Sequence, residues 1–381
     1  MAADESEPAQ RRRTVRLGRV LVVSAVALVL VVAGYAAYAV LIAPGAHGGN
    51  TLVVYSYTSL LGGCGGSVAQ SLLANFTAEY GVPVDLECPP GTLVNTLLSE
   101  KNAPAADVVV GLDEITAPQA EADGLLVPYT PPSLRDVNGT LAAELSPDHA
   151  VTPYEWGYLA FDYNVTFLAS TQGAIRNATF EQFAANTSWS SNLMIEDPTA
   201  DITGEEFLLW EIAYATYVAH VDWRSWWQAV LPHLRVAPDW SSAFADFSTP
   251  PNNPGVVVSY SLDPAYAAYY GGTPSFNSTV AWHNGSAYGW KTIYGVGIVA
   301  GTRHLTSAQE FVNWFLSGGV QAQLPTNEWE YPANGTVELP GVFAAALDPR
   351  EIVALNPDLS PSMIVQDLPG WIGDWQTIAN Q

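Results

Sequence analysis

Tyrosines crowd into one short stretch of the chain. The segment VVVSYSLDPAYAAYY (256–270) begins as an apolar strand and contains Tyr260, Tyr266, Tyr269 and Tyr270. Side chains of this type can pack in a core, bind a hard metal ion, or line a pocket for an organic molecule. The aromatic residues elsewhere in the chain bear on which of these roles applies.

Further aromatic side chains occur where turn-forming residues predominate. Trp240 lies in APDWSSAF, between a predicted strand and a predicted helix, and Trp329 lies in the Pro-, Asn- and Gly-rich segment LPTNEWEYPANG. In open α/β sheets, ligands bind beyond the carboxyl ends of the strands. A desolvated aromatic face attracts a cation by about 0.5–2 kcal/mol. As a set at strand ends these residues favour a binding site, while ordinary core or surface packing stays open for each one alone.

The sequence contains no arrangement typical of an enzyme. It has no G-x-S-x-G, P-loop or dinucleotide fingerprint, and its six histidines are scattered without an HExxH motif. The glycines of GGCGG (62–66) lack the Lys-Ser/Thr that follows a phosphate-binding loop. We therefore expect no catalytic residue, no cofactor and no resident metal.

The first 50 residues differ from the rest. An uncharged apolar run from Val20 to Pro44 is long enough to cross a bilayer as a helix, and it follows Arg11, Arg12, Arg13, Arg16 and Arg19. We expect a cytoplasmic tail (1–19), a membrane anchor or uncleaved signal (20–43) and a linker (44–50), with the remainder extracellular or periplasmic. An AYA triplet (37–39) leaves cleavage open.

The charge of the external part excludes several partners. Without the N-terminal residues the chain has 8 basic and 34 acidic side chains, a net charge of −26. Nucleic acid and anionic lipid surfaces are poor partners for such a body. The charge is that of a solvated acidic surface, and it also favours a cationic ligand.

Two further features suit an exported protein. Cys64 and Cys88 are the only cysteines, and a disulfide between them would contribute about 3 kcal/mol. Glycosylation sequons occur eight times, at Asn75, Asn138, Asn164, Asn177, Asn186, Asn277, Asn284 and Asn334. We expect a disulfide and a glycoprotein.

The pattern of elements predicts an α/β fold. After the linker, strands at 52–57, 82–87 and 106–113 alternate with helices at 67–81 and 92–101, which favours a largely parallel sheet. The alternation resumes with strands at 158–164, 192–197, 256–260 and 294–301 and helices at 205–220, 223–234 and 307–318. The last of these helices should bury Ala308, Phe311, Val312 and Phe315.

We interpret this pattern as two α/β lobes. Strands near 154–162 and 288–298 join them. Lobe 1 comprises 51–155 and 295–381, and lobe 2 comprises 156–294.

Several segments, in order, resemble the periplasmic thiamine-binding proteins of ABC importers, which have the type II solute-binding fold. The combination of PTxxWxYPxxxxxxLP with SYxxxPAY is the specific part. The likeness runs through LVVYSYTSL (52–60), ADVVVGLDE (106–114), VTPYEWGYLAFDYN (151–164), IEDPTADITGEEFLLW (195–210), PDWSSAF (238–244), VVVSYSLDPAY (256–266), LPTNEWEYPANGTVELP (324–340) and WIGDWQ (371–376).

The resemblance implies a set of ligand-binding residues. The positions that match those around the thiamine rings are Tyr57, Trp240, Tyr260, Tyr266 and Trp329, with Ser59 and Asp113 beside the same cleft. Tyr266 and Trp329 are expected to sandwich an aromatic ring. Tyr269 and Tyr270 are expected to be helix packing or surface.

The chain also departs from the family pattern. Thr58 and Pro90 stand where the family often has acidic residues, and Asp263 could restore negative charge locally. Asp201 replaces the serine of a DPxxS loop, and a carboxylate there should repel a phosphate. We therefore expect free thiamine to bind more tightly than its phosphate esters.

The resemblance implies capture rather than catalysis. The lobes would close on the ligand by hinge bending, and the closed form would dock on an ABC permease driven by a separate ATPase, with the anchor holding the receptor at the membrane. Three alternatives stay open: a ferric-ion carrier that uses Tyr269 and Tyr270, a carrier of polyamines or other organic cations, and an anchored surface glycoprotein without a transport role.

Overall fold

The computed structural model describes residues 49–250, 253–272 and 275–381. The predicted cytoplasmic tail and membrane anchor lie outside the described residues. Thr51–Gln381 form one compact unit. Within the described ranges, no helix is both long and apolar enough to cross a membrane.

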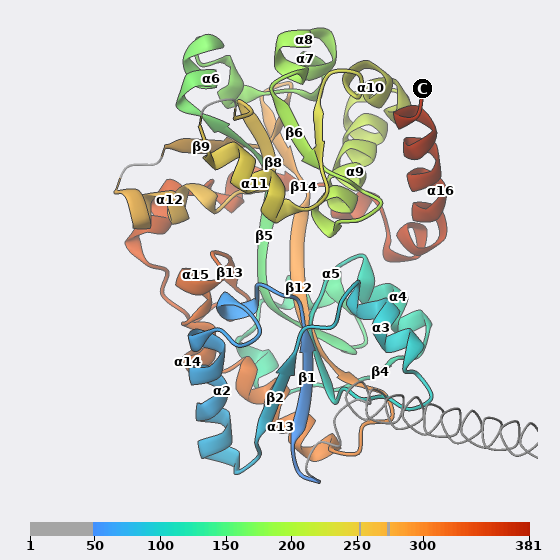
Figure 1. Ribbon diagram of the computed structural model, residues 1–381, viewed down its shortest axis with the longest axis vertical. Helices are drawn as coiled ribbons and strands as arrows, with labels where there is room; N and C mark the ends of the chain where they lie inside the picture. The colour runs from blue at the N-terminus through green and yellow to red at the C-terminus, as the bar shows by residue number, and fades with distance from the viewer. Residues whose placement is uncertain (1–48, 251–252, 273–274) are drawn as a thin grey trace, which may run out of the picture. The chain divides into compact units, whose positions relative to one another are not determined.

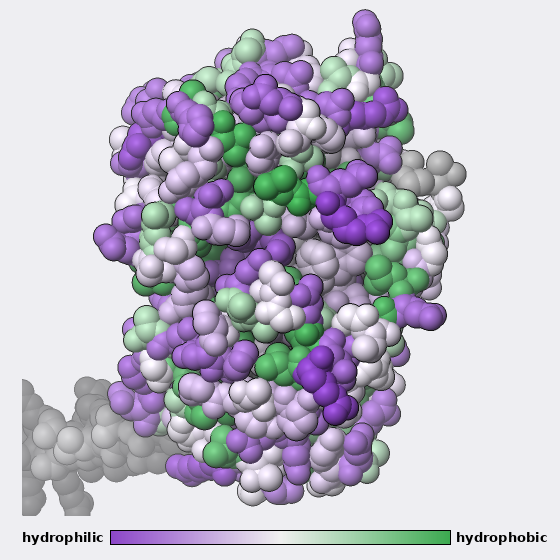
Figure 2. Space-filling view, turned by 180° about the vertical axis from the view of Figure 1, so that it is seen from behind, coloured by the Kyte–Doolittle hydropathy of each residue, from purple (hydrophilic) through white to green (hydrophobic). Residues whose placement is uncertain are grey.

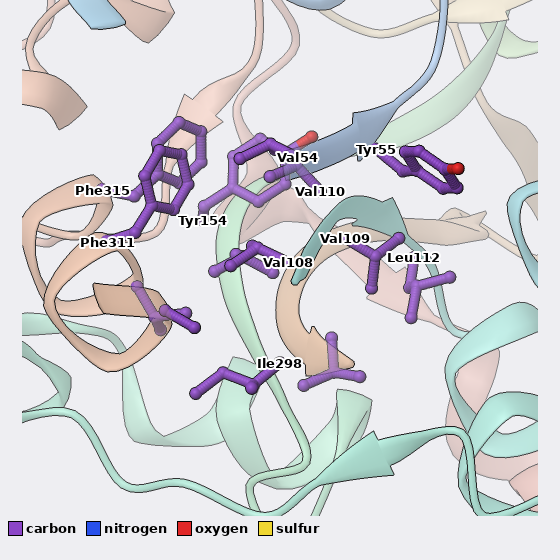
Figure 3. Close-up of a cluster of buried hydrophobic side chains, with 14 of the residues drawn as sticks. Val54, Tyr55, Val108, Val109, Val110, Leu112, Tyr154, Ile298, Phe311 and Phe315 are labelled. Atoms are coloured by element: carbon purple, nitrogen blue, oxygen red, sulfur yellow. The ribbon is translucent and has the colours of Figure 1, made fainter. Parts of the chain in front are cut away.

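Lobe 1 is built on a parallel sheet in the order β2-β1-β3. Its strands are β1 (Leu52–Ser56), β2 (Val84–Glu87) and β3 (Val108–Leu112), connected by helices α2 (Ser67–Tyr80) and α3 (Leu93–Ser99). The predicted β-α-β-α-β start is confirmed. Apolar side chains on both faces of the sheet form the core of this lobe (Figure 3).

Smaller elements complete lobe 1. Those that follow β3 and those near the end of the chain are α4 (Thr116–Ala122), β4 (Leu126–Val127), α5 (Gly139–Leu145), α13 (Leu305–Phe315), α14 (Gly318–Gln321), α15 (Leu324–Asn327) and β13 (Tyr331–Pro332). Helix α13 buries the four apolar side chains predicted from its spacing.

Lobe 2 has a second parallel set of strands, β8-β6-β7. These are β6 (Leu193–Glu196), β7 (Arg235–Ala237) and β8 (Val256–Tyr260). Its helices are α6 (Val165–Ser170), α7 (Phe180–Ala185), α8 (Thr187–Ser190), α9 (Ile202–Ala213), α10 (Trp223–Val230), α11 (Trp240–Ser248) and α12 (Asp263–Gly271). The core is strongly aromatic, with Phe161, Phe180, Phe207, Trp210 and Trp227 all buried.

Two long strands cross between the lobes (Figure 1). The first half of β5 (Val151–Asn164) pairs with β12 (Lys291–Val299), and its second half pairs with β8 and with β9 (Phe276–Thr279). The far end of β12 pairs with β3 in lobe 1. The predicted two-lobed α/β fold is confirmed, although these crossing strands are antiparallel to their neighbours.

The C-terminal part differs from the expected lobe bounds. After β13, a short 3₁₀ helix (Gly341–Ala345) packs on α12, and α16 (Pro361–Ala379) packs on α10 (Figure 1). A small sheet joins β10 (Ala281–His283), β11 (Ser286–Gly289) and β14 (Ile352–Ala354). The core of lobe 2 therefore includes Leu355, Leu359, Ile364 and Trp375, from the stretch that the sequence assigned to lobe 1. After β13 the chain passes between the lobes for a third time. This segment lacks the strand pattern that identified the other two crossings.

The predicted disulfide is present. Cys64 and Cys88 are bonded, with their Cα atoms 6.0 Å apart. The bond ties the turn after β1 to the end of β2, at one edge of the lobe 1 sheet.

Some sequons have a structural explanation. In three of them the asparagine side chain accepts a hydrogen bond from the backbone N–H two residues on, at the Ser or Thr that completes the motif: Asn138, Asn186 and Asn334. Asn334 is only 2% exposed, so it is closed to a glycan in this fold. Turn formation accounts for the pattern there, and glycosylation elsewhere stays a prediction.

One face of the molecule is largely polar (Figure 2). The face opposite that of Figure 1 is largely hydrophilic, with hydrophobic residues in small groups (Figure 2). Such scattered apolar residues are normal on a soluble domain.

Candidate functional site

A network of tyrosines, one buried and three half-buried, lies where the lobes meet. The hydroxyl of Tyr57, just after β1, lies 3.0 Å from the Tyr154 hydroxyl and donates to Glu155 Oε1 at 3.1 Å or Glu328 Oε2 at 2.9 Å. The Tyr57 ring needs Gly111 beneath it, because a Cβ there would lie 2.4 Å from the ring. The network ties lobe 1 to the crossing strand β5 and to the segment after α15.

The same network continues into lobe 2. The Tyr260 hydroxyl, at the end of β8, lies 3.1 Å from the hydroxyl of Tyr294 on β12 and 3.1 Å from Thr203 Oγ1 on α9. The ring centroids of Tyr57 and Tyr294 are 6.1 Å apart. We call the set Tyr57, Tyr154, Tyr260 and Tyr294 the inner tyrosine network.

A second group of rings lies further out. Trp329, from the segment after α15, contacts three tyrosines of α12, with centroid distances of 5.4 Å to Tyr266, 5.2 Å to Tyr269 and 5.9 Å to Tyr270. Phe343 stacks on Trp329 at 6.4 Å. We call these five residues the outer aromatic cluster.

The geometry of this cluster bears on the expected sandwich. The rings of Tyr266 and Trp329 meet edge to face at 83°, so in this structure they contact each other directly. A ligand ring between them requires the two side chains to separate, and the sandwich stays a prediction. Tyr269 and Tyr270 are exposed, as expected, but they also pack on Trp329.

Asp113 and Asp201 hold the backbone at helix starts. Asp113 Oδ1 accepts hydrogen bonds from the backbone N–H groups two and three residues on, each at 2.8 Å. Asp201 caps α9 through Thr203 N at 3.0 Å and also accepts from Trp240 N at 3.4 Å. Burial raises the pKa of both carboxyl groups. Both have a capping role here, and ligand contact by either stays a prediction.

Asp263 and Trp240 belong to one chain of hydrogen bonds. The Trp240 indole donates to Ser259 Oγ at 2.9 Å, and Ser259 Oγ donates to Asp263 Oδ2. The same oxygen accepts from Tyr260 N at 3.1 Å. Burial raises the pKa of Asp263 to about 6. This carboxyl therefore positions the end of β8 and the Trp240 ring, which lies edge-on to Tyr260 at 6.0 Å.

Ser59 stands apart from these networks. It is exposed at the start of the 3₁₀ turn Leu60–Gly62, and its side chain makes no capping hydrogen bond. This turn is held to the site because Leu61 N donates to Glu328 Oε1. A ligand contact at Ser59 stays a prediction.

Sequence reasoning missed the glutamates of the site. Burial raises the pKa of Glu328 to about 7 and that of Glu205 to about 8, and it raises the pKa values of Glu155, Glu206 and Glu330 well above the ordinary range. A signal was available, because charged residues rarely occur in apolar runs such as PYEWGY and GEEFLLW unless they have a role.

The electrostatics of the site favour a positive ligand. Within the described ranges, the charged groups with the largest effect on the pKa values of Glu155, Glu206 and Glu330 are all carboxylates, and no cation is among them. No group of three or more His, Cys, Asp or Glu side chains in that part of the chain is arranged to hold a metal ion. Aromatic faces beside uncompensated carboxylates suit an organic cation.

Comparison with protein families identifies a match over most of the chain. Residues 65–322 match the family described as bacterial extracellular solute-binding protein. A thiamine-binding periplasmic protein of Brucella suis biovar 1 (strain 1330) is 25% identical over 340 residues, which cover 88% of this chain and 93% of the relative.

Solved structures share the fold. A periplasmic thiamin binding protein superposes with a TM-score of 0.72 at 22% identity, over 88% of this chain and 98% of the other. Iron-bound HitA from Pseudomonas aeruginosa superposes with a TM-score of 0.66 at 16% identity, over 85% and 99%. At these identities the likeness establishes the fold alone.

Proposed function

Because the chain belongs to the bacterial extracellular solute-binding proteins, a family that binds solutes and does not catalyse reactions, we propose that it captures thiamine or a related vitamer between its lobes. It would then deliver this ligand to an ABC permease. The curated relatives that bear the name thiamine-binding periplasmic protein support this choice of ligand.

One observation about the site carries the proposal. Tyr57 of lobe 1 and Tyr260 of lobe 2 lie beside buried glutamates whose charged neighbours, among the described residues, are carboxylates. Thiamine offers both matching features, a fixed positive charge on its thiazolium ring and a second aromatic ring. The cation would lower the cost of closing the lobes over ionised carboxylates.

The proposed route of delivery follows from the fold and the family. The protein acts outside the cytoplasm, as its relatives do. We propose that the N-terminal apolar run anchors it to the membrane near the permease and its ATPase, which raises its effective concentration there. Ligand would favour the closed state only through contacts made in that state.

The form of the vitamer is a separate proposal. Asp201 sits at the start of α9, where a helix N-terminus would otherwise attract a phosphate. Its carboxylate should disfavour thiamine phosphates. Tighter binding of thiamine pyrophosphate than of thiamine would contradict this part of the proposal.

The alternatives differ in measurable ways. A ferric-ion carrier that uses Tyr269 and Tyr270 predicts a visible phenolate charge-transfer band on adding Fe(III). Polyamines are cations, so the acidic site makes them competitors of thiamine for binding. A surface glycoprotein without a transport role predicts no response to any of these ligands.

Calorimetric titration of the ligand-free protein tests the proposal. We expect one-to-one binding of thiamine, weaker binding of its phosphates and little heat with spermidine or Fe(III). Binding of spermidine or Fe(III) in preference to thiamine would retain the family and change the substrate.

A further inference from the structure

Two glutamates from different lobes are buried without partners. Glu206, near the start of α9 in lobe 2, is 0% exposed, and neither of its carboxylate oxygens has a hydrogen-bond partner among the described residues. Glu330, just before β13, is 6% exposed, and its Oε2 also lacks a partner within the described ranges. Native proteins rarely leave buried polar groups unsatisfied, so a missing partner requires an explanation.

The surroundings of Glu206 contain no compensating cation in the part of the chain that the structure describes. The titratable groups that act on it are carboxyls and phenols: Glu114, Asp113, Asp201 and Glu330, together with Tyr260 and Tyr294. An isolated buried carboxylate is costly unless it is neutralised or paired.

Glu114 provides a contrast within the same group. Its Oε1 accepts from the Trp290 indole at 2.7 Å, and its Oε2 accepts from Ile293 N at 3.0 Å. Both oxygens are satisfied by the protein, so Glu114 holds the crossing strand in place. By contrast, both carboxylate oxygens of Glu206 and Oε2 of Glu330 have no hydrogen-bond partner in the described part of the chain.

Glu330 is placed at the boundary between the lobes. It packs against Gly157 of β5, where a Cβ would lie 2.1 Å from Glu330 Oε2. The charge of Glu330 also raises the pKa of Glu206. The two glutamates, which come from different lobes, therefore lie close enough for their charges to interact.

We propose that Glu206 and Glu330 together receive a hydrogen-bond-donating, positively polarised nitrogen group of the ligand, which in thiamine is the amino group of the pyrimidine ring. This inference rests on the proposed function, and it assigns the orientation of the ligand: the amino end lies toward Glu206 and Glu330, and the other ring lies toward the outer aromatic cluster. Because each lobe supplies one carboxylate, the group completes its contacts only when the lobes close.

The first test uses the wild-type protein and two ligands. We expect thiamine to bind about tenfold to a hundredfold more tightly than the analogue whose pyrimidine amino group is replaced by a keto oxygen, because hydrogen bonds to charged groups are strong. Equal affinities would overturn the inference and leave the proposed function intact. If neither ligand binds, the proposed function itself fails.

The second test uses E206Q and E330Q, with E211Q as a matched control. Glu211 lies on the same helix, is 1% exposed and has one oxygen without a partner in the described structure, but it bonds to the Trp227 indole in the lobe 2 core. We expect E206Q and E330Q to reduce the preference for thiamine over the keto analogue, and E211Q to retain it. Full retention of the preference in folded E206Q and E330Q would overturn the inference.

Proton release gives a readout that does not depend on variant stability. Burial raises the pKa values of Glu206 and Glu330, and hydrogen bonds donated by the amino group should favour the ionised carboxylates and lower these pKa values again. Calorimetry of the wild type in two mildly acidic buffers of different ionisation enthalpy should therefore show proton release when thiamine binds. The absence of proton release would contradict the inference.

Discussion

Tyrosines occupy two regions between the lobes, and they differ in what their hydroxyl groups do. In the inner tyrosine network, Tyr57 and Tyr260 bond through their hydroxyls to other tyrosines, to Thr203 or to glutamates. In the outer aromatic cluster, Tyr266, Tyr269 and Tyr270 are 37%, 52% and 68% exposed and contact their neighbours through their rings.

This difference separates two roles for one residue type. Tyrosines with bonded hydroxyls fix the geometry of the site, and the buried glutamates around them carry its dependence on proton binding. Exposed tyrosines that contact Trp329 present ring surface, which can move when a ligand enters. The predictions below test whether stability depends on the inner region and affinity on the outer one.

The largest expected effect is the dependence of stability on pH. Burial raises the pKa of Glu114 and Glu205 to about 8 and that of Glu328 to about 7 in the folded state. The folded protein therefore binds more protons than the unfolded chain in this range. Stability is fully present below the ordinary carboxylate pKa and is lost as pH rises from about 5 to about 8, by an amount on the order of a few kcal/mol.

Denaturant unfolding at several pH values measures this effect. E328Q should flatten the dependence, because one of the titrating groups is removed. A free energy of unfolding that increases steadily from mildly acidic to mildly alkaline pH would contradict the assignment of raised pKa values to the inner region.

The next effect concerns a single hydroxyl of the inner network. Tyr57→Phe should lower the free energy of unfolding by about 1–3 kcal/mol, because it removes one of the buried donors to Glu155 and Glu328. The matched control, Tyr270→Phe, removes an exposed hydroxyl of the outer cluster and should change stability by less than about 0.5 kcal/mol. Equal losses for both variants would remove the distinction between the two regions.

Trp329 should matter for affinity more than for folding. Trp329→Ala should weaken thiamine binding by about 0.5–2 kcal/mol, the range for a cation on an aromatic face, and Trp329→Phe should retain part of that affinity. Titration calorimetry measures both. Unchanged affinity in Trp329→Ala would reject its role as a wall of the site.

The smallest effect is expected at the outermost tyrosine. Tyr270 is 68% exposed, so Tyr270→Ala should change stability by less than about 0.5 kcal/mol and should leave thiamine affinity close to that of the wild type. A large loss of affinity, measured in the same titrations, would extend the ligand-contacting surface to Tyr270.

Patterns confined to one element predicted the fold well. The strand Val256–Tyr260 has the bounds expected from its apolar run, and α13 buries the four side chains expected from their spacing. In the strand an unbroken apolar run, and in the helix the spacing of the apolar residues, determines which side chains are buried. The assignment of residues after 346 to lobe 1 had no such pattern to guide it, because their packing on α10 is a contact between distant segments.

The site was predictable in its aromatic residues and much less so in its acids. Trp240 and Tyr260 were identified from their positions at element ends, and the structure brings their rings together. The sequence singled out Asp113 and Asp263, which the fold uses for capping and positioning, and it missed Glu206 and Glu330. Whether a carboxylate finds a partner depends on groups far along the chain, so burial without a partner became visible only in three dimensions.

The most direct test of the account is a crystal structure of the protein with thiamine bound. We predict ligand density between the lobes, with one ring at Tyr266 and Trp329 and the amino group of the pyrimidine within hydrogen-bonding distance of Glu206 or Glu330. Thiamine bound away from both the inner tyrosine network and the outer aromatic cluster would contradict the central claim.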